Sequence, residues 1–502
     1  MSRQAMSRVA AVSAVSAVLA VTALGVSGCS GGGAAKSSGS SGSSGLIGGS
    51  SAGKAGDADA PGGSSLSGQV PPGFSNATAW STSVDWADSG IGKPTLGSED
   101  QGVSNLVVAQ QQGTLGVART VGTSVVVPSF SPGGAAGPVV ATLKFLDAKT
   151  GKPIAEKKLP AGTFLGLASD VAAGKPVAVV RYQSGQNDQS PVVVVFDASG
   201  AQVWSSQDQQ AVGDQPPSTG DQDGDGAAFM GGYTLRLNDG KDTSDHTDSS
   251  YDVLDIGGKS VLHVPMYADK WDTNSVDIVQ GYAVVLYDDS LSQSDTSLSK
   301  EHFTVYDLAA GGKKVGEVAE KDSGGMADAA GAVAAGGKVM MTWLDHTGGG
   351  STAPNMMTVL DTATGQTTAP APIPVGVGGY RTLIDPATSN VLFYDDSDVP
   401  NSGSIMVSLA KGTVLWTQND GHKALIPLSL HNGVVYGIEP AQLGFTDARQ
   451  LAVKEADGTP AGTDYDLSPL DFTADGAPLF AEADTDVETG GSTVMVGVGR
   501  GA

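Results

Sequence analysis

The chain has 502 residues, of which 53 are acidic and 28 are basic, and its formal net charge is −25. A surface this negative repels the phosphate backbone of nucleic acids and the headgroups of anionic lipids, so we expect no nucleic-acid partner. Cys29 is the one cysteine, which excludes an intrachain disulfide and a thiolate metal site made from this chain alone.

Residues 1–28 have the layout of a secretory signal peptide. Arg3 and Arg8 precede an apolar, uncharged run over residues 9–26. The run ends in Val26-Ser27-Gly28-Cys29, which resembles the lipobox of bacterial lipoproteins. The resemblance implies cleavage after Gly28 and lipidation of the Cys29 sulfur, and two or three acyl chains anchor a protein stably. We expect a lipoprotein at the outer leaflet of the cytoplasmic membrane; the alternative is an ordinary signal peptide with an incidental cysteine.

Residues 29–73 follow as a segment of Gly, Ser and Ala with few charges. Such a composition lacks the apolar residues that a core needs, so the sequence predicts a disordered tether that begins at the lipidated cysteine. A flexible coil of this length spans on the order of 35 to 40 Å. The tether therefore lifts a globular domain, predicted for residues 74–502, clear of the membrane surface.

Residues 74–502 contain short β-branched and aromatic runs separated by Gly, Asp, Asn and Pro, which is typical of many short strands. A hairpin unit recurs, consisting of a strand that ends in an acid, a turn with Gly, and a second strand. Its acid position falls at residues 147, 197, 255, 307, 361, 409 and 455, with Leu409 and Glu455 in place of Asp in the two weaker copies. The mean step is about 51 residues, close to the length of one blade of a β-propeller.

The residues of each turn explain why the chain reverses direction there. An aspartate at a strand end accepts hydrogen bonds from its own turn amides, and Gly supplies the positive φ that closes the turn. The return strands carry an apolar anchor at Ile154, Trp204, Leu262 and Trp416. Runs opened by Gly or Asn before each hairpin are predicted as inner strands, and they cover residues 174–180, 281–286, 337–343, 390–394 and 432–438.

The predicted fold class is therefore all-β, a β-propeller of four-stranded blades. The length of residues 74–502 is about eight repeat steps, so eight blades are favoured, with seven blades and an N-terminal extension as the alternative. We expect both chain ends to form the eighth blade, with residues 478–481 and 492–498 as strands and Ala79-Trp80-Ser81 as the return strand. Joining the ends in one blade removes the exposed strand edges of the ring.

The motif of strand, Leu-Asp, Thr-Gly-Lys and then Trp resembles the repeat of quinoprotein-like propellers, best seen in residues 147–152 and 361–365. That family includes pyrroloquinoline quinone (PQQ) dehydrogenases and the outer-membrane assembly lipoprotein BamB, and the resemblance covers most of residues 106–465. Its methanol-oxidising branch uses a vicinal disulfide, for which this chain has no second cysteine. The resemblance therefore implies a BamB-like docking platform without PQQ, although the high Gly, Ala and Asp content is typical of actinobacterial proteins, whose envelope lacks that machinery.

Asp221-Gln222-Asp223-Gly224-Asp225-Gly226 begins like a calcium loop, with carboxylates at alternate positions and Gly at the sharp turn. The twelfth position is Gly232, where such a loop needs a bidentate Glu. Asp221, Asp223 and Asp225 are therefore candidate Ca²⁺ ligands, and an acidic loop between strands is the alternative interpretation.

Other polar and aromatic clusters carry weaker signals. The acidic stretch from Asp239 to Asp252 has no rigid ligand spacing and is predicted as a blade insertion, and residues 395–398 follow a strand at a propeller face. The histidines show no spacing typical of a metal site, and His346, beside Asp345, is the one histidine considered as a functional candidate. Trp86, Trp271 and Trp343 are candidates for exposed aromatic contacts, with buried blade packing as the alternative.

No recognisable catalytic set appears, so we expect no catalytic residues and no cofactor beyond a calcium ion in the loop above. The favoured hypothesis is a membrane-anchored, non-catalytic binding or scaffolding platform for a protein or a component of the cell envelope. The alternatives are a divergent quinone-dependent dehydrogenase or sugar-active hydrolase, and a sensor of a small ligand or of calcium.

Overall fold

The structure is a computed structural model, and the chain divides into two units, Met1–Asp57 and Ala58–Ala502. The residues that it describes lie in the second unit. They are 65–66, 68–85, 118–131, 140–184, 192–207, 229–238, 249–268, 271–288, 301–319, 328–344, 355–373, 381–385, 387–394, 404–418, 425–439, 449–462, 465–483 and 493–501.

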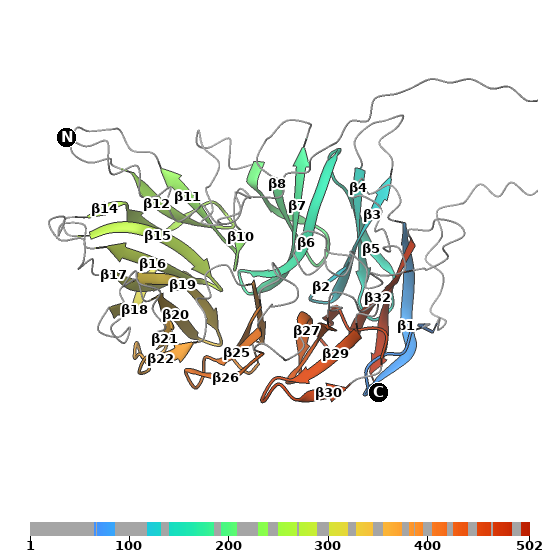
Figure 1. The fold of residues 1–502 in the computed structure, drawn as a ribbon. Coiled ribbons are helices and arrows are strands. Elements are labelled where there is room, and N and C mark those ends of the chain that lie inside the picture. Colours follow the sequence, from blue (N-terminus) through green and yellow to red (C-terminus); the bar gives the residue numbers. More distant parts are fainter. Residues whose placement is uncertain are drawn as a thin grey trace, which may run out of the picture. The chain divides into compact units, whose positions relative to one another are not determined.

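The described residues form an all-β ring of eight antiparallel sheets, the blades of a β-propeller (Figure 1). This confirms the predicted fold class, with eight blades and not seven. The first four blades hold β2 (Arg119–Val121) to β5 (Pro153–Lys158), β6 (Gly162–Ala172) to β9 (Gln202–Ser205), β10 (Phe229–Met230) to β13 (Ser260–Pro265), and β14 (Tyr267–Ala268) to β18 (Lys313–Ala319). Their middle strands are β3 (Ser124–Ser131), β4 (Val140–Asp147), β7 (Lys175–Ser184), β8 (Val192–Asp197), β11 (Tyr233–Asn238), β12 (Ser250–Asp255), β15 (Trp271–Val279), β16 (Tyr282–Asp288) and β17 (Glu301–Asp307).

Blades 5 to 8 continue the same order. They hold β19 (Asp328–Ala335), β20 (Lys338–Leu344), β21 (Asn355–Asp361), β22 (Ala371–Ile373); β23 (Arg381–Asp385), β24 (Asn390–Tyr394), β25 (Ser404–Ser408), β26 (Thr413–Thr417); β27 (Ile426–His431), β28 (Val434–Glu439), β29 (Arg449–Lys454), β30 (Pro460–Gly462); and β31 (Asp471–Phe472), β32 (Pro478–Ala483), β33 (Thr493–Gly501), β1 (Phe74–Asp85). Blade 4 alone has a fifth strand, because the two-residue β14 pairs with β15.

Both ends of the described chain meet in blade 8, as the sequence predicts. The sheet order is β1-β33-β32-β31, and β1 runs antiparallel to β33 with Trp80 opposite Val498. Figure 1 shows the blue strand β1 beside the red strands at the C-terminal end. Because β1 pairs with β33, the first and last segments of the ring are held by a hydrogen-bonded ladder and not by loop contacts alone.

The runs predicted as inner strands lie second from the axis, as β7, β16, β20, β24 and β28. The innermost strands are β2, β6, β15, β19, β23, β27 and β31, with β10 in blade 3. Several of them contain polar residues or runs of Ala and Gly, as in Ser169-Asp170 and Ala329-Ala330-Gly331. The apolar pattern of the second strands, which are buried on both faces, is therefore the stronger sequence signal.

The repeated aspartates close their own turns. Oδ1 of Asp147 accepts hydrogen bonds from the Thr150 amide at 2.8 Å and hydroxyl at 2.7 Å, and Asp197 Oδ1 accepts from the Ser199 and Ala201 amides. In blades 6 and 7, the residues at this position are Ser408 and Lys454, whose carbonyls accept from Gly412 and Gly458. The prediction of Leu409 and Glu455 for the acid position is thus wrong by one residue, and both side chains belong to the next, buried position.

Several outer strands pack against a turn glycine of the following blade. Trp80 lies on Gly151 and Trp416 on Gly458, where an added Cβ would come within 2.7 Å and 3.0 Å of the indole rings. In blade 1, Ala155 takes this place against Gly200, and the predicted anchor Ile154 is 44% exposed. The strand period is two, so a shift of one residue sends the predicted side chain to the opposite face.

Residues 65–73, which the sequence assigns to the tether, pack on the last blades. Leu66 and Val70 are buried beside Phe480. The Gly68 amide donates to Glu482 Oε1 at 2.8 Å, and the Gln69 amide donates to Asp466 Oδ2 at 2.8 Å. The signal for this packing is two isolated apolar residues in a Gly/Ser background, which is too sparse to predict from composition.

Candidate functional site

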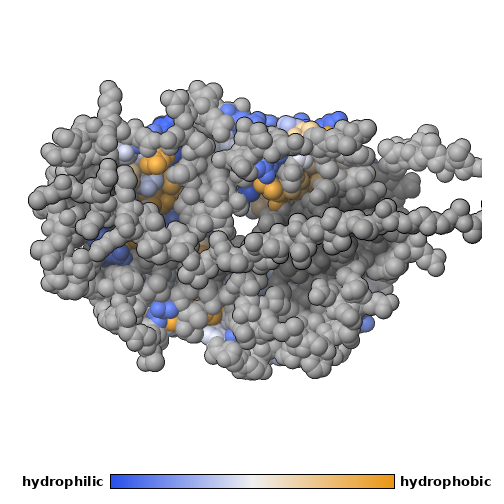
Figure 2. Space-filling model, turned by 45° about the horizontal axis from the view of Figure 1, so that its top comes forward, coloured by the Kyte–Doolittle hydropathy of each residue, from blue (hydrophilic) through white to orange (hydrophobic). Residues whose placement is uncertain are grey.

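A cavity of about 690 Å³ lies where the innermost strands of several blades converge. Its wall includes residues of β2, β6, β23, β27 and β31, together with Gln280 of the β15–β16 turn. The polar wall residues include Arg119, Ser169, Asp385, His431 and Asp471, and Leu383, Leu430, Leu470 and Phe472 are among the apolar ones. Figure 2 shows an opening near the centre of the molecule with hydrophobic surface beside it. We call this space the axial cavity.

The axial cavity is bordered by the tight turns that join the first and second strands of the blades. These turns touch one another around the ring: the Gly231 amide donates to Asp170 Oδ2 at 2.9 Å, and a Cβ on Gly231 would lie 2.8 Å from the Gly281 nitrogen. Asn432 of the β27–β28 turn lines the cavity as well. The side of the ring formed by these turns, with Val171 and Met230 exposed on it, is called the turn face below.

One wall of the cavity is an aromatic pair. His431 stacks on Phe472 with ring centroids 4.0 Å apart and an interplanar angle of 13°, and His431 Nε2 lies 2.9 Å from Asn432 Nδ2. Burial lowers the pKa of His431, and the negative charge of Asp385 partly opposes this shift. The imidazole is therefore neutral at neutral pH and offers a flat surface for stacking.

Asp471 joins the last innermost strand to the first one across the cavity wall. Its Oδ2 accepts hydrogen bonds from the amide of Thr120 at 2.9 Å and from the hydroxyl of Thr120 at 2.7 Å. Its Oδ1 accepts from the Phe472 amide at 2.8 Å. The carboxylate thus holds β31 against β2, and its lone pairs are largely used by the fold and not left for a ligand.

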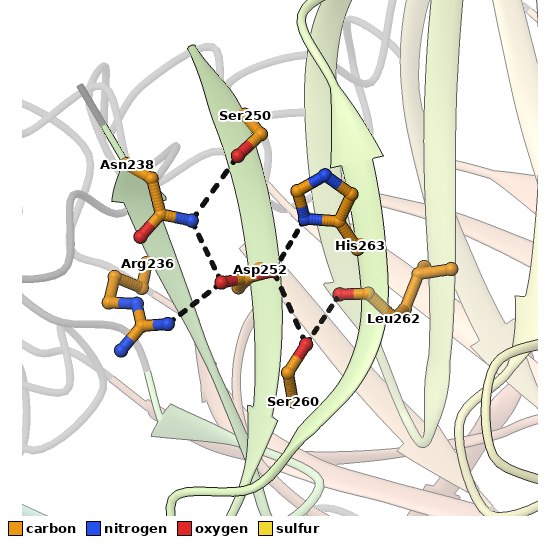
Figure 3. Close-up of polar contacts among 7 residues, drawn as sticks. All are labelled: Arg236, Asn238, Ser250, Asp252, Ser260, Leu262 and His263. Carbon is orange, nitrogen blue, oxygen red and sulfur yellow. Dashed lines mark hydrogen bonds and ion pairs between the residues drawn. The ribbon is translucent and has the colours of Figure 1, made fainter. Parts of the chain in front are cut away.

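A second polar cluster lies on blade 3, centred on Asp252 (Figure 3). Asp252 accepts from Arg236 Nη2 at 2.8 Å and Asn238 Nδ2 at 2.8 Å, and from Ser260 Oγ at 3.2 Å; His263 Nδ1 lies 2.9 Å away. Burial opposes ionisation, but hydrogen bonds from Arg236, His263 and Asn238 outweigh it and lower the pKa of Asp252 to about 2. Asp252 is thus a satisfied carboxylate in strand β12, and this member of the predicted acidic insertion has a structural role.

Most of the residues singled out by sequence lie outside the described ranges. These are Cys29, Asp221, Asp223, Asp225, Trp86, His346 and residues 395–398. Trp343 is fully buried in blade 5, which confirms the packing interpretation for that residue. His302 is buried and stacks on Tyr287.

The cavity residues could not be predicted from the sequence, for a physical reason. Arg119, Asp385, His431 and Asp471 come from four different blades and carry no common spacing in the chain. The one available signal is that His431-Asn432-Gly433 and Asp385 stand at the ends of innermost strands. Among the described residues, no helix is long and apolar enough to span a membrane.

The described residues thus define an eight-bladed β-propeller with an axial cavity of mixed polarity. No protein-family model matches the chain, and no curated protein matches it. Among solved structures, it is similar to a europium-containing methanol dehydrogenase (12% identity, 73% of this chain and 83% of that chain, TM-score 0.35). It is also similar to the β-propeller domain of the Trilobed protease from Pyrococcus furiosus (9%, 68% and 94%, TM-score 0.35) and to a eukaryotic initiation factor (11%, 70% and 87%, TM-score 0.36). At such TM-scores these likenesses add nothing to what the sheet topology establishes.

Proposed function

We propose that this protein is an extracytoplasmic lipoprotein, anchored through lipid on Cys29 to the outer face of the cell membrane, whose propeller binds a protein or envelope component without catalysing a reaction. The lipobox-like Val26-Ser27-Gly28-Cys29 supports the anchor. The Gly/Ser-rich segment behind it supports a tether that gives the ring reach.

The axial cavity carries the binding part of the proposal. A concave site with apolar walls and a few fixed polar groups is the usual form of a recognition site. Here Arg119 and the stacked pair His431–Phe472 bring a positive charge and a flat aromatic surface to the wall of one cavity. Such a wall favours a ligand group that combines a planar or apolar part with a hydrogen-bond acceptor.

The turn face supports docking of a larger partner. Val171 is 49% exposed and Met230 is 43% exposed, and both belong to innermost strands at turns that touch each other. The turns are short and hydrogen-bonded, so little conformational entropy is lost when a partner binds them. A rigid surface with exposed apolar side chains beside a cavity is suited to recognition of one partner.

In-cell crosslinking of the native lipoprotein, followed by recovery from membranes and mass spectrometry, tests this proposal. A Cys29→Ala form provides the unanchored control. One stoichiometric partner that is lost in the control supports an anchored platform. Recovery of the Cys29→Ala form in the membrane fraction at the wild-type level would contradict the anchor, and turnover of a substrate by the purified protein would contradict the non-catalytic part.

A further inference from the structure

Blade 7 has a carboxylate at a repeat position where blades 1 to 6 have none. The residue after the turn aspartate position is Ala148, Ala198, Ile256, Leu308, Thr362, Leu409 and, in blade 7, Glu455. The amides of Leu308, Leu409 and Glu455 each donate to a carbonyl of the neighbouring tight turn, which shows that they occupy equivalent places. Glu455 is 2% exposed. The fold therefore accepts an apolar residue here, and the buried carboxylate is specific to blade 7.

Blade 6 departs from the repeat at the point that faces Glu455. Its first two strands, β23 and β24, are joined by four residues, whereas β6–β7, β15–β16 and β27–β28 are joined by two. The innermost strand of blade 6 ends in Asp385, which is 6% exposed, where β6 and β15 end in Ala172 and Val279. Asp385 and Glu455, two acids at positions where the compared blades have other residues, thus lie at the same interface, between blades 6 and 7.

The hydrogen bonds at this interface leave one acceptor without a donor. Thr388 Oγ1 donates to Glu455 Oε1 at 2.7 Å, and the Ala387 amide donates to Asp385 Oδ1 at 2.8 Å. Asp385 Oδ2 is fully buried and has no hydrogen-bond partner. A buried carboxylate oxygen without a donor is costly, so a proton on the facing Glu455 would supply the missing donor.

The charges around the pair favour that protonated form. Burial raises the pKa of Glu455, and the negative charge of Asp385 raises it further, against hydrogen bonds from Thr388 and Asn390. His431, at the end of β27, lies close enough for the negative charge of Asp385 to act on the pKa of its imidazole. From β26, the uncharged Trp416 donates Nε1–H to the Glu455 carbonyl at 2.8 Å. Lys454 and Asp457 of the same hairpin are exposed and solvated.

We propose that Asp385 and Glu455 share one proton across the interface of blades 6 and 7, forming a buried proton-binding site in the wall of the axial cavity. Two neighbouring buried carboxylates cannot both ionise without a large cost in free energy. Loss of the shared proton at higher pH places a second negative charge between the blades. Because Asp385 also lines the cavity, the charge of the cavity wall and the fit of the two blades change together with pH. This inference does not depend on the proposed docking function.

The sign of the pH dependence follows from linkage. A carboxyl whose pKa is raised in the folded state contributes stability that is fully present below its unfolded pKa, about 4.3 for Glu. That contribution is lost as the pH rises towards the folded pKa, because the unfolded chain ionises first. Within this window, each pH unit favours unfolding of the wild type by up to about tenfold relative to a variant that cannot titrate.

Glu455→Gln is that variant in the full chain. Its amide can donate to Asp385 Oδ2 and its carbonyl can accept from Thr388, but it holds no proton to lose. We expect the ratio of the unfolding constants, wild type to E455Q, to rise with pH above about 4.3 when measured by urea unfolding. Glu156→Gln, on the exposed outer strand β5, is the matched control, and it should leave the wild-type curve unchanged.

Asp385→Asn provides an independent test that does not need E455Q to fold. Its amide supplies a donor to Glu455 and removes the facing charge, so the loss of stability with rising pH should shrink. Infrared spectroscopy of the wild type just above a pH of about 4.3 should also show a protonated carboxyl band that is absent in E455Q. Curves for E455Q and D385N that parallel the wild type at every pH, with no such band, would overturn the proposal. Stabilisation of the wild type by added Ca²⁺ that disappears in E455Q would also overturn it, since the pair would then hold a cation.

Discussion

The indole of Trp80 joins the first described strand to the first blade that follows it. Trp80 Nε1 donates to the carbonyl oxygen of Ala148 at 2.8 Å, and the ring covers Gly151. Trp416 makes the same contact with blade 7, donating to the Glu455 carbonyl at 2.8 Å. The interface between blades 8 and 1, where the two ends of the described chain meet, therefore has the same tryptophan contact as the interface between blades 6 and 7.

Replacing Trp80 by Ala should lower the free energy of unfolding by about 3 to 5 kcal/mol, because a buried aromatic side chain and its hydrogen bond are both lost. Urea unfolding measures this loss. Trp416→Ala is the comparison, and it should cost less because Trp416 is only half-buried. A loss below about 1 kcal/mol for Trp80→Ala would show that the interface between blades 8 and 1 does not depend on this contact.

Alanine substitutions at Gly151 and Gly174 distinguish two ways in which an added Cβ lowers stability, backbone strain and a steric clash. Both have positive φ, +67° and +74°, but only a Cβ on Gly151 would meet Trp80, at 2.7 Å, while nothing lies within 4 Å of one on Gly174. Gly174→Ala should cost about 1 to 2 kcal/mol from the backbone alone. Gly151→Ala should cost about 1 to 3 kcal/mol more from the clash. Equal thermal stabilities of the two variants would contradict packing of Trp80 on this turn.

Asp252 should stabilise the fold above its unfolded pKa and lose this effect in acid. Its folded pKa of about 2 is below the ordinary 3.8, so its contribution is present above pH 3.8 and is lost as the pH falls through about 2. Asp252→Asn should therefore cost about 2 to 3 kcal/mol at neutral pH, where Arg236 loses a charged acceptor. Acid unfolding followed by circular dichroism should show the difference between wild type and variant shrinking as the pH falls. A difference that stays constant down to the acid end would contradict the account of this cluster.

Deletion of residues 74–85 should expose the full edge of β33. An unpaired edge strand is a template for pairing with another chain, so the variant should self-associate or aggregate. Light scattering of the purified protein measures this. Deletion of residues 30–57, which lie in the other unit of the chain, is the control and should leave the association state unchanged. An association state that does not change after removal of β1 would contradict closure of the ring by this strand.

The fold was predictable from sequence because each hairpin of the repeat is determined by residues that are close together in the chain. Each Asp-to-Gly turn is encoded within about five residues, and Trp80 in Ala79-Trp80-Ser81 could be recognised as the missing return strand of blade 8. The copies at Ser408 and Lys454 were aligned one residue late because neither has the acid that marks the turn elsewhere.

The axial cavity was not predictable in the same way. Arg119, His431 and Asp471 meet only because innermost strands far apart in the sequence converge at the axis. The pairing of Asp385 with Glu455 likewise depends on how two blades are placed side by side, which the repeat period alone does not specify.

Site-specific photo-crosslinking in cells tests the central claim, that the ring is a binding platform, most directly. A photoreactive residue would replace Val171 or Met230 on the turn face, and Ile154 or Val203 on the exposed outer strands would serve as controls. The account predicts one discrete adduct from both turn-face positions and none from the outer strands. No adduct from Val171 and Met230, or the same adducts from all four positions, would contradict it.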